Sequence, residues 1–77
     1  MATTKQLLAL QAVERHGSFT GAAIELGIHV ASAFKRVKKL EAEMGKDLTE
    51  GSRGVGTKLT QAGTGLLKRS KKLLRDL

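Results

Sequence analysis

Four cationic side chains lie close together near the middle of the chain: Lys35, Arg36, Lys38 and Lys39. No acidic residue falls among them, although an exposed helix face commonly alternates acidic and basic residues. Ammonium and guanidinium groups bind phosphate oxygens through charge-assisted hydrogen bonds. The cluster therefore indicates a surface that binds a polyanion.

These cations belong to a segment, residues 27–45, whose apolar positions repeat at the period of an α-helix. One side of this helix is expected to face the core, and it carries Val30, Ala33, Phe34, Val37, Leu40 and Met44. The opposite side has small residues at the start and cations further along: Ala31, Ser32, Lys35, Lys38 and Lys39, with Arg36 at its edge. A helix divided in this way buries one face and offers the other to a partner.

Two helices are expected before the basic helix. The first runs from near Thr4, a predicted N-cap, to Gly17, and a shorter one follows from Ser18 to Gly27. The first is apolar around most of its circumference, which fits burial in its own domain or partial cover by a second subunit. A short helix, a tight glycine turn and a longer amphipathic helix form the helix-turn-helix pattern, whose second helix enters the DNA major groove.

Residues 47–50 and 57–59 flank a glycine-rich loop, GSRGVG, and predict a β-hairpin. Such a hairpin would be the wing of a winged helix-turn-helix. Arg53 at its tip would contact the minor groove or a phosphate, or would remain solvated. A phosphate-binding P-loop is not indicated, because Gly56 is followed by Thr57 and Lys58 in a strand instead of by Lys and a helix.

The last helix is expected to begin after Thr60, a predicted N-cap, and to continue to the end of the chain. Its leucines repeat at seven residues and would form one seam: Leu66, Leu73 and Leu77, with Leu67 and Leu74 alongside. This seam would pack on the first helix or pair two subunits, and spare apolar surface on both terminal helices favours a homodimer. The predicted dimer contact comprises Leu7, Leu10, Leu66, Leu67, Leu73, Leu74 and Leu77.

Composition narrows the possible functions. The chain has 77 residues, enough for one small domain, and a formal net charge of +7, which attracts phosphate at long range. Without cysteine, disulfides and thiolate metal sites are excluded, and two separated histidines do not form a zinc site. No membrane-spanning run or signal peptide is indicated, so a cytoplasmic protein is expected. No catalytic constellation is recognisable, so we predict neither enzyme activity nor a cofactor.

Four motifs occur in order along the chain: a Gly-Ser-aromatic-Thr start, an Ala-Ala pair, a basic helix ending in Leu-Glu-x-Glu-x-Gly, and Leu-Thr-x-Ala-Gly. They lie in GSFTGAAIELGIHVASAFKRVKKLEAEMGKDLTEGSRGVGTKLTQAG, which resembles the N-terminal DNA-binding domain of LysR-type transcriptional regulators. Ser32-Ala33-Phe34 also resembles the Ser-Ala-aromatic segment of the molybdate-responsive repressors. Both resemblances imply a winged helix-turn-helix whose last helix pairs two subunits.

The chain departs from the LysR pattern at several positions. His29, Val30 and Ala31 stand where the family usually has serine, a polar groove-reading residue and often proline. Thr49 replaces an aromatic residue before the wing. The family's effector-binding domain is longer than this whole chain, so we expect an excised domain or a free-standing small regulator without a small-molecule effector domain.

We therefore predict a mainly α fold with a small β-hairpin: a winged helix-turn-helix with a three-helix core, a wing and a C-terminal dimerisation helix. Residues 1–59 would form the DNA-binding part, and residues 60–77 the linker and dimerisation helix of the same single domain. The expected function is sequence-specific or semi-specific binding of double-stranded DNA as a nucleoid-associated transcriptional regulator. The predicted DNA-binding residues are Ser18, Thr20, His29, Ala31, Ser32, Lys35, Arg36, Lys38, Lys39, Arg53 and Lys58.

These residues are expected to differ in role. Ser32 would form a hydrogen bond with a base edge, Ala31 would contact a thymine methyl group, and Lys35 would bind guanine or a phosphate. The other cations, and the start of the second helix, would bind the DNA backbone and add affinity without sequence information. With few base-reading side chains, we expect modest sequence discrimination and strong salt dependence.

Two other binding functions stay open. The basic helix could bind RNA, although Phe19 and Phe34 are both expected in the core, which leaves no stacking platform for unpaired bases. A small module that binds an acidic protein surface is the other alternative, because one fold serves many functions.

Overall fold

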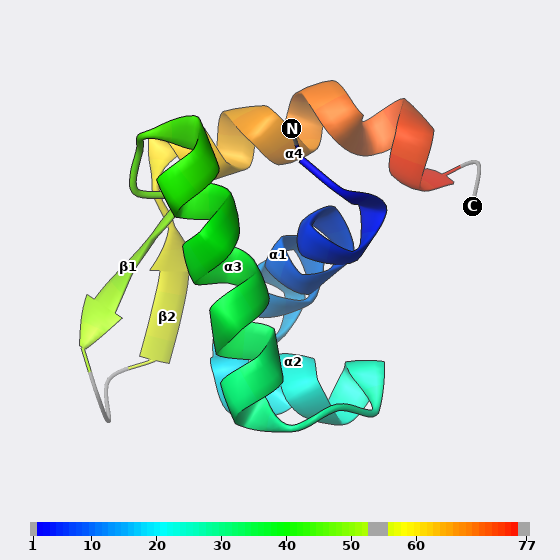
Figure 1. Ribbon diagram of the computed structural model, residues 1–77, viewed down its shortest axis with the longest axis vertical. Helices are drawn as coiled ribbons and strands as arrows, with labels where there is room; N and C mark the ends of the chain where they lie inside the picture. Colours follow the sequence, from blue (N-terminus) through cyan, green and yellow to red (C-terminus); the bar gives the residue numbers. More distant parts are fainter. Residues whose placement is uncertain (1, 53–55, 76–77) are drawn as a thin grey trace.

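The computed structural model describes residues 2–52 and 56–75. Its elements, in chain order, are α1 (Thr4–His16), α2 (Phe19–Leu26), α3 (Val30–Met44), β1 (Thr49–Ser52), β2 (Gly56–Leu59) and α4 (Gln61–Arg75). Figure 1 shows α3 in front of α1, with α2 at one end of this pair, α4 across the other end and the hairpin beside α3. The predicted mainly helical fold with one small hairpin is confirmed.

Local capping interactions set where the first two helices begin and end. Thr3, one residue before the predicted cap, begins α1 in a capping box with Gln6. The Ser18 side chain caps α2 as predicted, since its Oγ accepts a hydrogen bond from the Gly21 amide at 2.9 Å. Gly17 ends α1 in the left-handed conformation, which a residue with a side chain rarely adopts. These caps produce the sharp turn that places α2 against α1.

The core is centred on α1, which contacts α2, α3, α4 and β2. Its largest fully buried side chains come from α1, α3 and the segment before β1: Leu10, Val13, Val37, Leu40 and Leu48. The apolar surface of α1 was expected to be buried in its own domain or partly covered by a second subunit. The structure shows the first, because α1 is buried by its own chain. The prediction that Leu7 and Leu10 form a subunit contact is therefore wrong, because both are buried within the single chain.

The leucine seam of α4 also packs largely against its own chain. Leu66, Leu67 and Leu74 are buried in the same core cluster as α1, so the expectation that they pair two subunits does not hold for their side chains. An apolar stripe of this spacing can pack on any neighbouring helix, and here it packs on α1 of the same chain instead of on a second copy of α4. Leu73 is different, with 54% of its surface exposed. Leu77 lies outside the described residues.

The hairpin is a two-stranded antiparallel sheet whose register runs from Thr49 opposite Leu59 to Ser52 opposite Gly56. The Thr57 amide donates to the Gly17 carbonyl at 2.8 Å, which attaches β2 to the turn between α1 and α2. Arg53, predicted at the tip, lies outside the described residues.

The start of α4 is fixed against Leu48. The Thr60 amide donates to the Leu48 carbonyl at 3.1 Å, and the Thr60 hydroxyl accepts from the Gly63 amide at 3.1 Å, as expected for an N-cap. Gly63 is buried so closely against Leu48 that a Cβ atom at this position would collide with the Leu48 carbonyl oxygen. Leu48, the residue before β1, thus holds the start of α4 against the hairpin.

An exposed cluster joins the end of α1 to α2. The Glu25 carboxylate accepts hydrogen bonds from Arg15 Nε and Nη2 at 2.8 and 2.7 Å and lies 2.8 Å from His16 Nε2. Arg15 first, and then His16, lower the pKa of Glu25 from 4.5 to about 2.

This shift predicts an acid-sensitive contribution to stability. Because the pKa of Glu25 is lower in the folded state, the contribution is complete above the ordinary value of 4.5 and is lost as the pH falls towards 2. Glu25→Gln is expected to lower the Tm at pH 5.5, and the gap from wild type should narrow by pH 3. Thermal unfolding followed by circular dichroism at both pH values measures this, and a gap that stays constant would contradict it.

Candidate nucleic-acid interface

The outward face of α3 carries the predicted binding residues. Ala31, Lys35 and Lys39 are exposed, whereas Ser32 and Arg36 are half-buried. Within the described residues, α1 and α2 both pack on the other side of α3 and leave this face uncovered (Figure 1). The first two turns of α3 are therefore open to a large partner.

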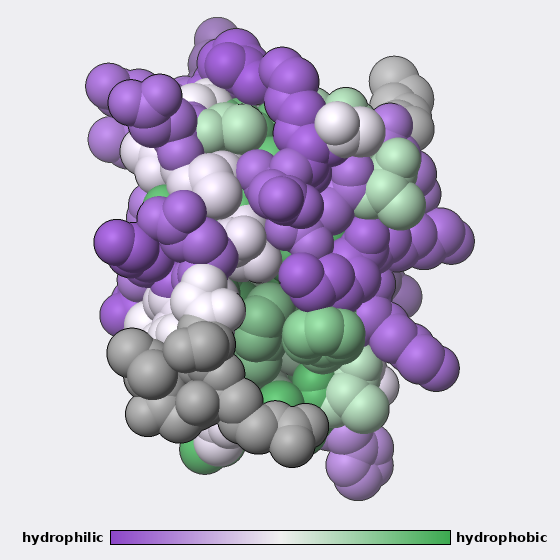
Figure 2. Space-filling view, turned by 90° about the vertical axis from the view of Figure 1, so that its left-hand side faces the viewer, coloured by the Kyte–Doolittle hydropathy of each residue, from purple (hydrophilic) through white to green (hydrophobic). Residues whose placement is uncertain are grey.

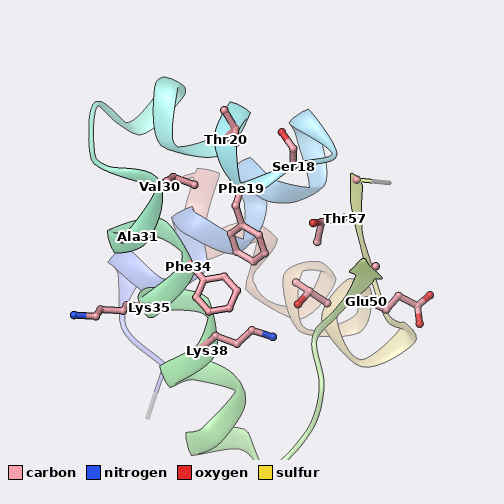
Figure 3. A pocket seen from close by; sticks show the side chains of 13 residues that line it. Ser18, Phe19, Thr20, Val30, Ala31, Phe34, Lys35, Lys38, Glu50 and Thr57 are labelled. Carbon is pink, nitrogen blue, oxygen red and sulfur yellow. The ribbon is translucent and has the colours of Figure 1, made fainter. Parts of the chain in front are cut away.

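A groove runs between α3 and the hairpin, and Figure 3 shows it from close by. We call it the α3–hairpin groove. It is lined by the first turns of α3, the start of α2 and both strands: Val30, Ala31, Phe34, Lys35, Lys38, Ser18, Phe19, Thr20, Thr49, Glu50, Gly51, Gly56 and Thr57. Helices α2 and α3 and the hairpin thus together supply one concave surface.

The floor of this groove differs from the sequence prediction. Val30 and Phe34 were expected in the core, yet 48% and 46% of their surfaces are exposed. Both residues lie at the edge of the inner face of α3, whose centre is already filled by buried Ala33, Val37 and Leu40. Figure 2 shows the resulting apolar surface bordered by hydrophilic side chains.

The ring of Phe34 is held in place on two sides. It meets the ring of Phe19 edge to face, with centroids 5.1 Å apart and an interplanar angle of 63°. Lys38 Nζ lies 5.2 Å from the centre of the Phe34 ring and 2.9 Å from Glu41 Oε1. Lys38, predicted to bind the DNA backbone, thus shares its charge with Glu41.

Lys35 has a different position from Lys38. Its side chain extends from the far flank of α3, away from Phe34, whereas Lys38 reaches across the ring (Figure 3). Lys35 is therefore placed to contact a partner larger than the groove itself.

The remaining predicted residues border the groove or lie further out. Ser18 caps α2 through an oxygen lone pair, which leaves its hydroxyl hydrogen to donate, and Thr20 is exposed beside it. His29 is exposed at the start of α3, but its side chain makes no cap hydrogen bond. Lys58 on β2 is exposed, with Nζ 3.6 Å from Glu50 Oε1.

Glu41 positions the groove and was missed by the sequence analysis. Only 7% of its surface is exposed, and its Oε2 accepts from the amides of Leu48 and Thr49 at 2.8 and 3.1 Å and from Thr49 Oγ1 at 3.2 Å. Burial alone would raise the pKa of Glu41, but hydrogen bonds from Lys38 and the two amides together lower it. An acid on the same side of the helix as Val37 and Met44 is the signal that could have revealed it.

Thr49 has a role in this arrangement as well. It stands where the LysR pattern has an aromatic residue, and it is buried with its hydroxyl on Glu41. A polar contact thus takes the place of aromatic packing at the start of the hairpin.

The sequence resembles both LysR-type regulators and molybdate-responsive repressors, and a family model matches the first of these. Residues 4–64 match the model described as "Bacterial regulatory helix-turn-helix protein, lysR family". The chain belongs to the LysR family. The match extends from α1 into α4 and includes every element that lines the α3–hairpin groove. It confirms the predicted family and the winged helix-turn-helix fold.

Solved structures of LysR-type regulators resemble this LysR-family domain closely. The CbnR DBD in its DNA complex is 31% identical with a TM-score of 0.84, over 91% of this chain and 79% of that chain. The BenM DBD with benA site 1 DNA is 35% identical with a TM-score of 0.81, over 92% of this chain and 79% of that one. ArgP from Mycobacterium tuberculosis is 33% identical with a TM-score of 0.82, over 95% of this chain.

The domain spans 27% of the length of ArgP, about a quarter of that regulator. No curated protein sequence matches it significantly. Within residues 2–52 and 56–75, no helix has the length and apolar character needed to cross a bilayer. The same described part contains no cluster of three His, Asp or Glu side chains suited to a metal ion.

Proposed function

We propose that this LysR-family domain binds double-stranded DNA as part of a transcriptional regulator, with the first half of α3 in the major groove. The observation that carries the proposal is the uncovered outward face of α3, on a chain similar to two domains whose structures were solved with DNA. The net charge of +7 supports it by favouring association with phosphate.

The structure supports different roles for the bordering residues. Ala31, Ser32 and Lys35 are proposed to approach base edges, since they lie on the first two turns of α3. Arg36 and Lys39 would bind phosphates. Further backbone contacts are proposed for the start of α2, the start of α3 and the wing, through Ser18, Thr20, His29, Arg53 and Lys58. This is a binding role without catalysis or a cofactor, carried out in the cytoplasm on the nucleoid.

Selection of bound duplexes from a random pool, followed by fluorescence anisotropy, tests this proposal. We expect binding at low salt and an affinity that falls linearly on a logarithmic scale as salt rises. An absence of duplex binding even in dilute buffer would reject DNA binding.

Lys35→Ala is expected to weaken binding about tenfold, or about 1.4 kcal/mol. If Lys35 binds a phosphate, the loss is uniform across sequences and the salt slope falls by about one; if it binds guanine, the loss falls on one base pair. Anisotropy titrations over a salt series separate the two roles. Lys71→Ala, which removes the same charge from the α1–α4 side, is the control and should retain the affinity of wild type. Equal losses in both variants would contradict a specific role for Lys35.

A homodimer formed through α4 is the second part of the proposal. Leu73 supports it, because this large apolar side chain is exposed on α4, at the opposite end of the domain from the start of α3 (Figure 1). Residues 60–77 would serve as the dimerisation segment. The contact would be smaller than the sequence predicted, since the other described leucines of the seam are buried in the single chain.

Leu73→Asp is expected to convert the dimer to a monomer, because it introduces a charge into an apolar contact. Sedimentation velocity over a concentration series measures this change. Ile24→Asp, at an even more exposed apolar position on α2, should leave the assembly state unaltered. A wild-type domain that remains monomeric at its highest soluble concentration would remove the dimer.

One observation favours a second candidate. Phe34 is exposed beside Phe19 and Lys38, so an aromatic stacking surface exists, contrary to the sequence expectation. Unpaired bases stack on such rings with little sequence preference. Competition of single-stranded RNA against a duplex of equal length distinguishes the two, and stronger binding of the single strand would favour this candidate.

A further inference from the structure

Several apolar side chains at the start of α3 are exposed. Val30, Ala31 and Phe34 occupy its first two turns, and together they form what we call the apolar patch. Each of the three lines the α3–hairpin groove. Exposure of adjacent large apolar side chains is unfavourable in water and indicates a contact with a partner.

The surroundings of the patch identify the kind of partner. Lys35 and Lys38 line the same groove, so a ligand that covers the patch must also be compatible with positive charge. Phe34 is fixed by Phe19 and Lys38, so little side-chain freedom remains to be lost when it is covered. The patch is therefore a preorganised apolar surface bordered by two lysines.

Double-stranded DNA offers one apolar group on the floor of its major groove, the C5-methyl group of thymine. The other groups on the base edges there are hydrogen-bond donors and acceptors. None of the three side chains of the patch can satisfy those groups, whereas all three can cover a methyl group.

We propose that the apolar patch reads thymine through its C5-methyl group, and that this contact supplies much of the sequence preference of the domain. The inference rests on the proposed binding of double-stranded DNA and names what that site recognises. It extends the role expected for Ala31 alone to Val30 and Phe34, which the sequence placed in the core.

Replacement of thymine by deoxyuridine removes the methyl group and leaves base pairing unchanged. The probe is the duplex selected from the random pool, with each thymine replaced in turn by deoxyuridine. A methyl group removed from water contributes roughly 0.8 kcal/mol, so we expect a loss of about threefold to fivefold at one or two positions and no loss elsewhere. At a sensitive position, a G·C pair carrying 5-methylcytosine should bind more tightly than the unmethylated pair.

Two variants assign the effect to the patch. In Val30→Ala and in Phe34→Ala, the ratio of affinities for the thymine and deoxyuridine duplexes should approach one at a sensitive position. Val30 is half-exposed, so its truncation leaves the core intact and the test does not depend on how well Phe34→Ala folds. Ile24→Ala, an exposed apolar truncation on α2 outside the groove, should keep the wild-type ratio.

The outcomes separate this inference from the function on which it rests. Duplex binding with equal affinity for thymine and deoxyuridine at every position overturns methyl recognition and leaves DNA binding intact. A selected site that contains no thymine would likewise overturn methyl recognition and leave DNA binding intact. A methyl effect that persists unchanged in both patch variants overturns the assignment to Val30 and Phe34. Failure to bind any duplex at low salt rejects the proposed function itself.

Discussion

Glu41→Ala is expected to lower the free energy of unfolding by about 3 kcal/mol, a large fraction of the stability of so small a domain. The carboxylate satisfies the buried amides of Leu48 and Thr49 and the Thr49 hydroxyl, and it pairs with Lys38. Alanine leaves these donors without an acceptor in a place that water scarcely reaches. The start of the hairpin should lose its attachment to α3 at the same time.

Glu41→Gln provides a graded comparison. Glutamine keeps one acceptor oxygen but loses the charge, so we expect a loss of about 1 to 2 kcal/mol. Because the pKa of Glu41 is lowered in the folded state, this contribution is complete above the ordinary value of 4.5 and is lost as the pH falls below it. Wild type and Glu41→Gln should therefore converge in acid.

Urea unfolding at neutral pH measures both variants. Glu14→Gln is the matched control, since it removes the same charge from an exposed position on α1 and should change stability by less than about 0.5 kcal/mol. If Glu41→Ala unfolds at the same urea concentration as this control, the hydrogen bonds of Glu41 do not stabilise the fold.

Gly63→Ala and Gly65→Ala are expected to change stability in opposite directions. A Cβ atom at Gly63 would collide with the Leu48 carbonyl oxygen, a backbone atom that can move only if the start of α4 moves. This should cost about 2 kcal/mol. At Gly65, two residues along the same helix, the added atom would meet Nη1 of Arg69 at 3.3 Å, and this flexible side chain can shift. The higher helix propensity of alanine should then stabilise the domain by about 0.5 to 1 kcal/mol.

Because both substitutions add the same methyl group to the same helix, the comparison isolates the close approach to Leu48. Urea unfolding of the two variants in parallel gives the sign directly. Stabilisation in both would show that α4 does not press against Leu48 as the structure has it.

The helices could be predicted from the sequence because local interactions determine where they begin and end. Ser18, Gly17 and Gly27 act at the ends of α1 and α2 as predicted, since an N-cap or a left-handed glycine depends on a few neighbouring residues. The short helix, the turn and the basic helix therefore followed from spacing alone, and the family resemblance was correct.

The exposed side chains of the site could not be predicted in the same way. A periodic pattern states which residues share a side of a helix, but not how wide a surface the rest of the chain covers. Val30 and Phe34 share a side with buried Val37, yet the hairpin leaves them open. The seam of α4 presents the same difficulty, since its spacing suits either a second copy or α1.

Contacts between distant segments were also beyond the sequence. Glu41 and Thr49 lie eight residues apart and meet because α3 ends and the chain turns back at Gly45. The periodicity of α3 places Glu41 on its buried side, but it does not say which donors in the next element the carboxylate accepts from.

Leu48 connects α3 to α4 through hydrogen bonds of its backbone. Its amide is bound by Glu41 of α3, its side chain is buried, and its carbonyl accepts from Thr60 at the start of α4. A tilt of α4 is therefore expected to shift the end of α3 through these contacts. In a dimer of the proposed kind, the angle at which two copies of α4 cross would then set the distance and phase between the two DNA half-sites.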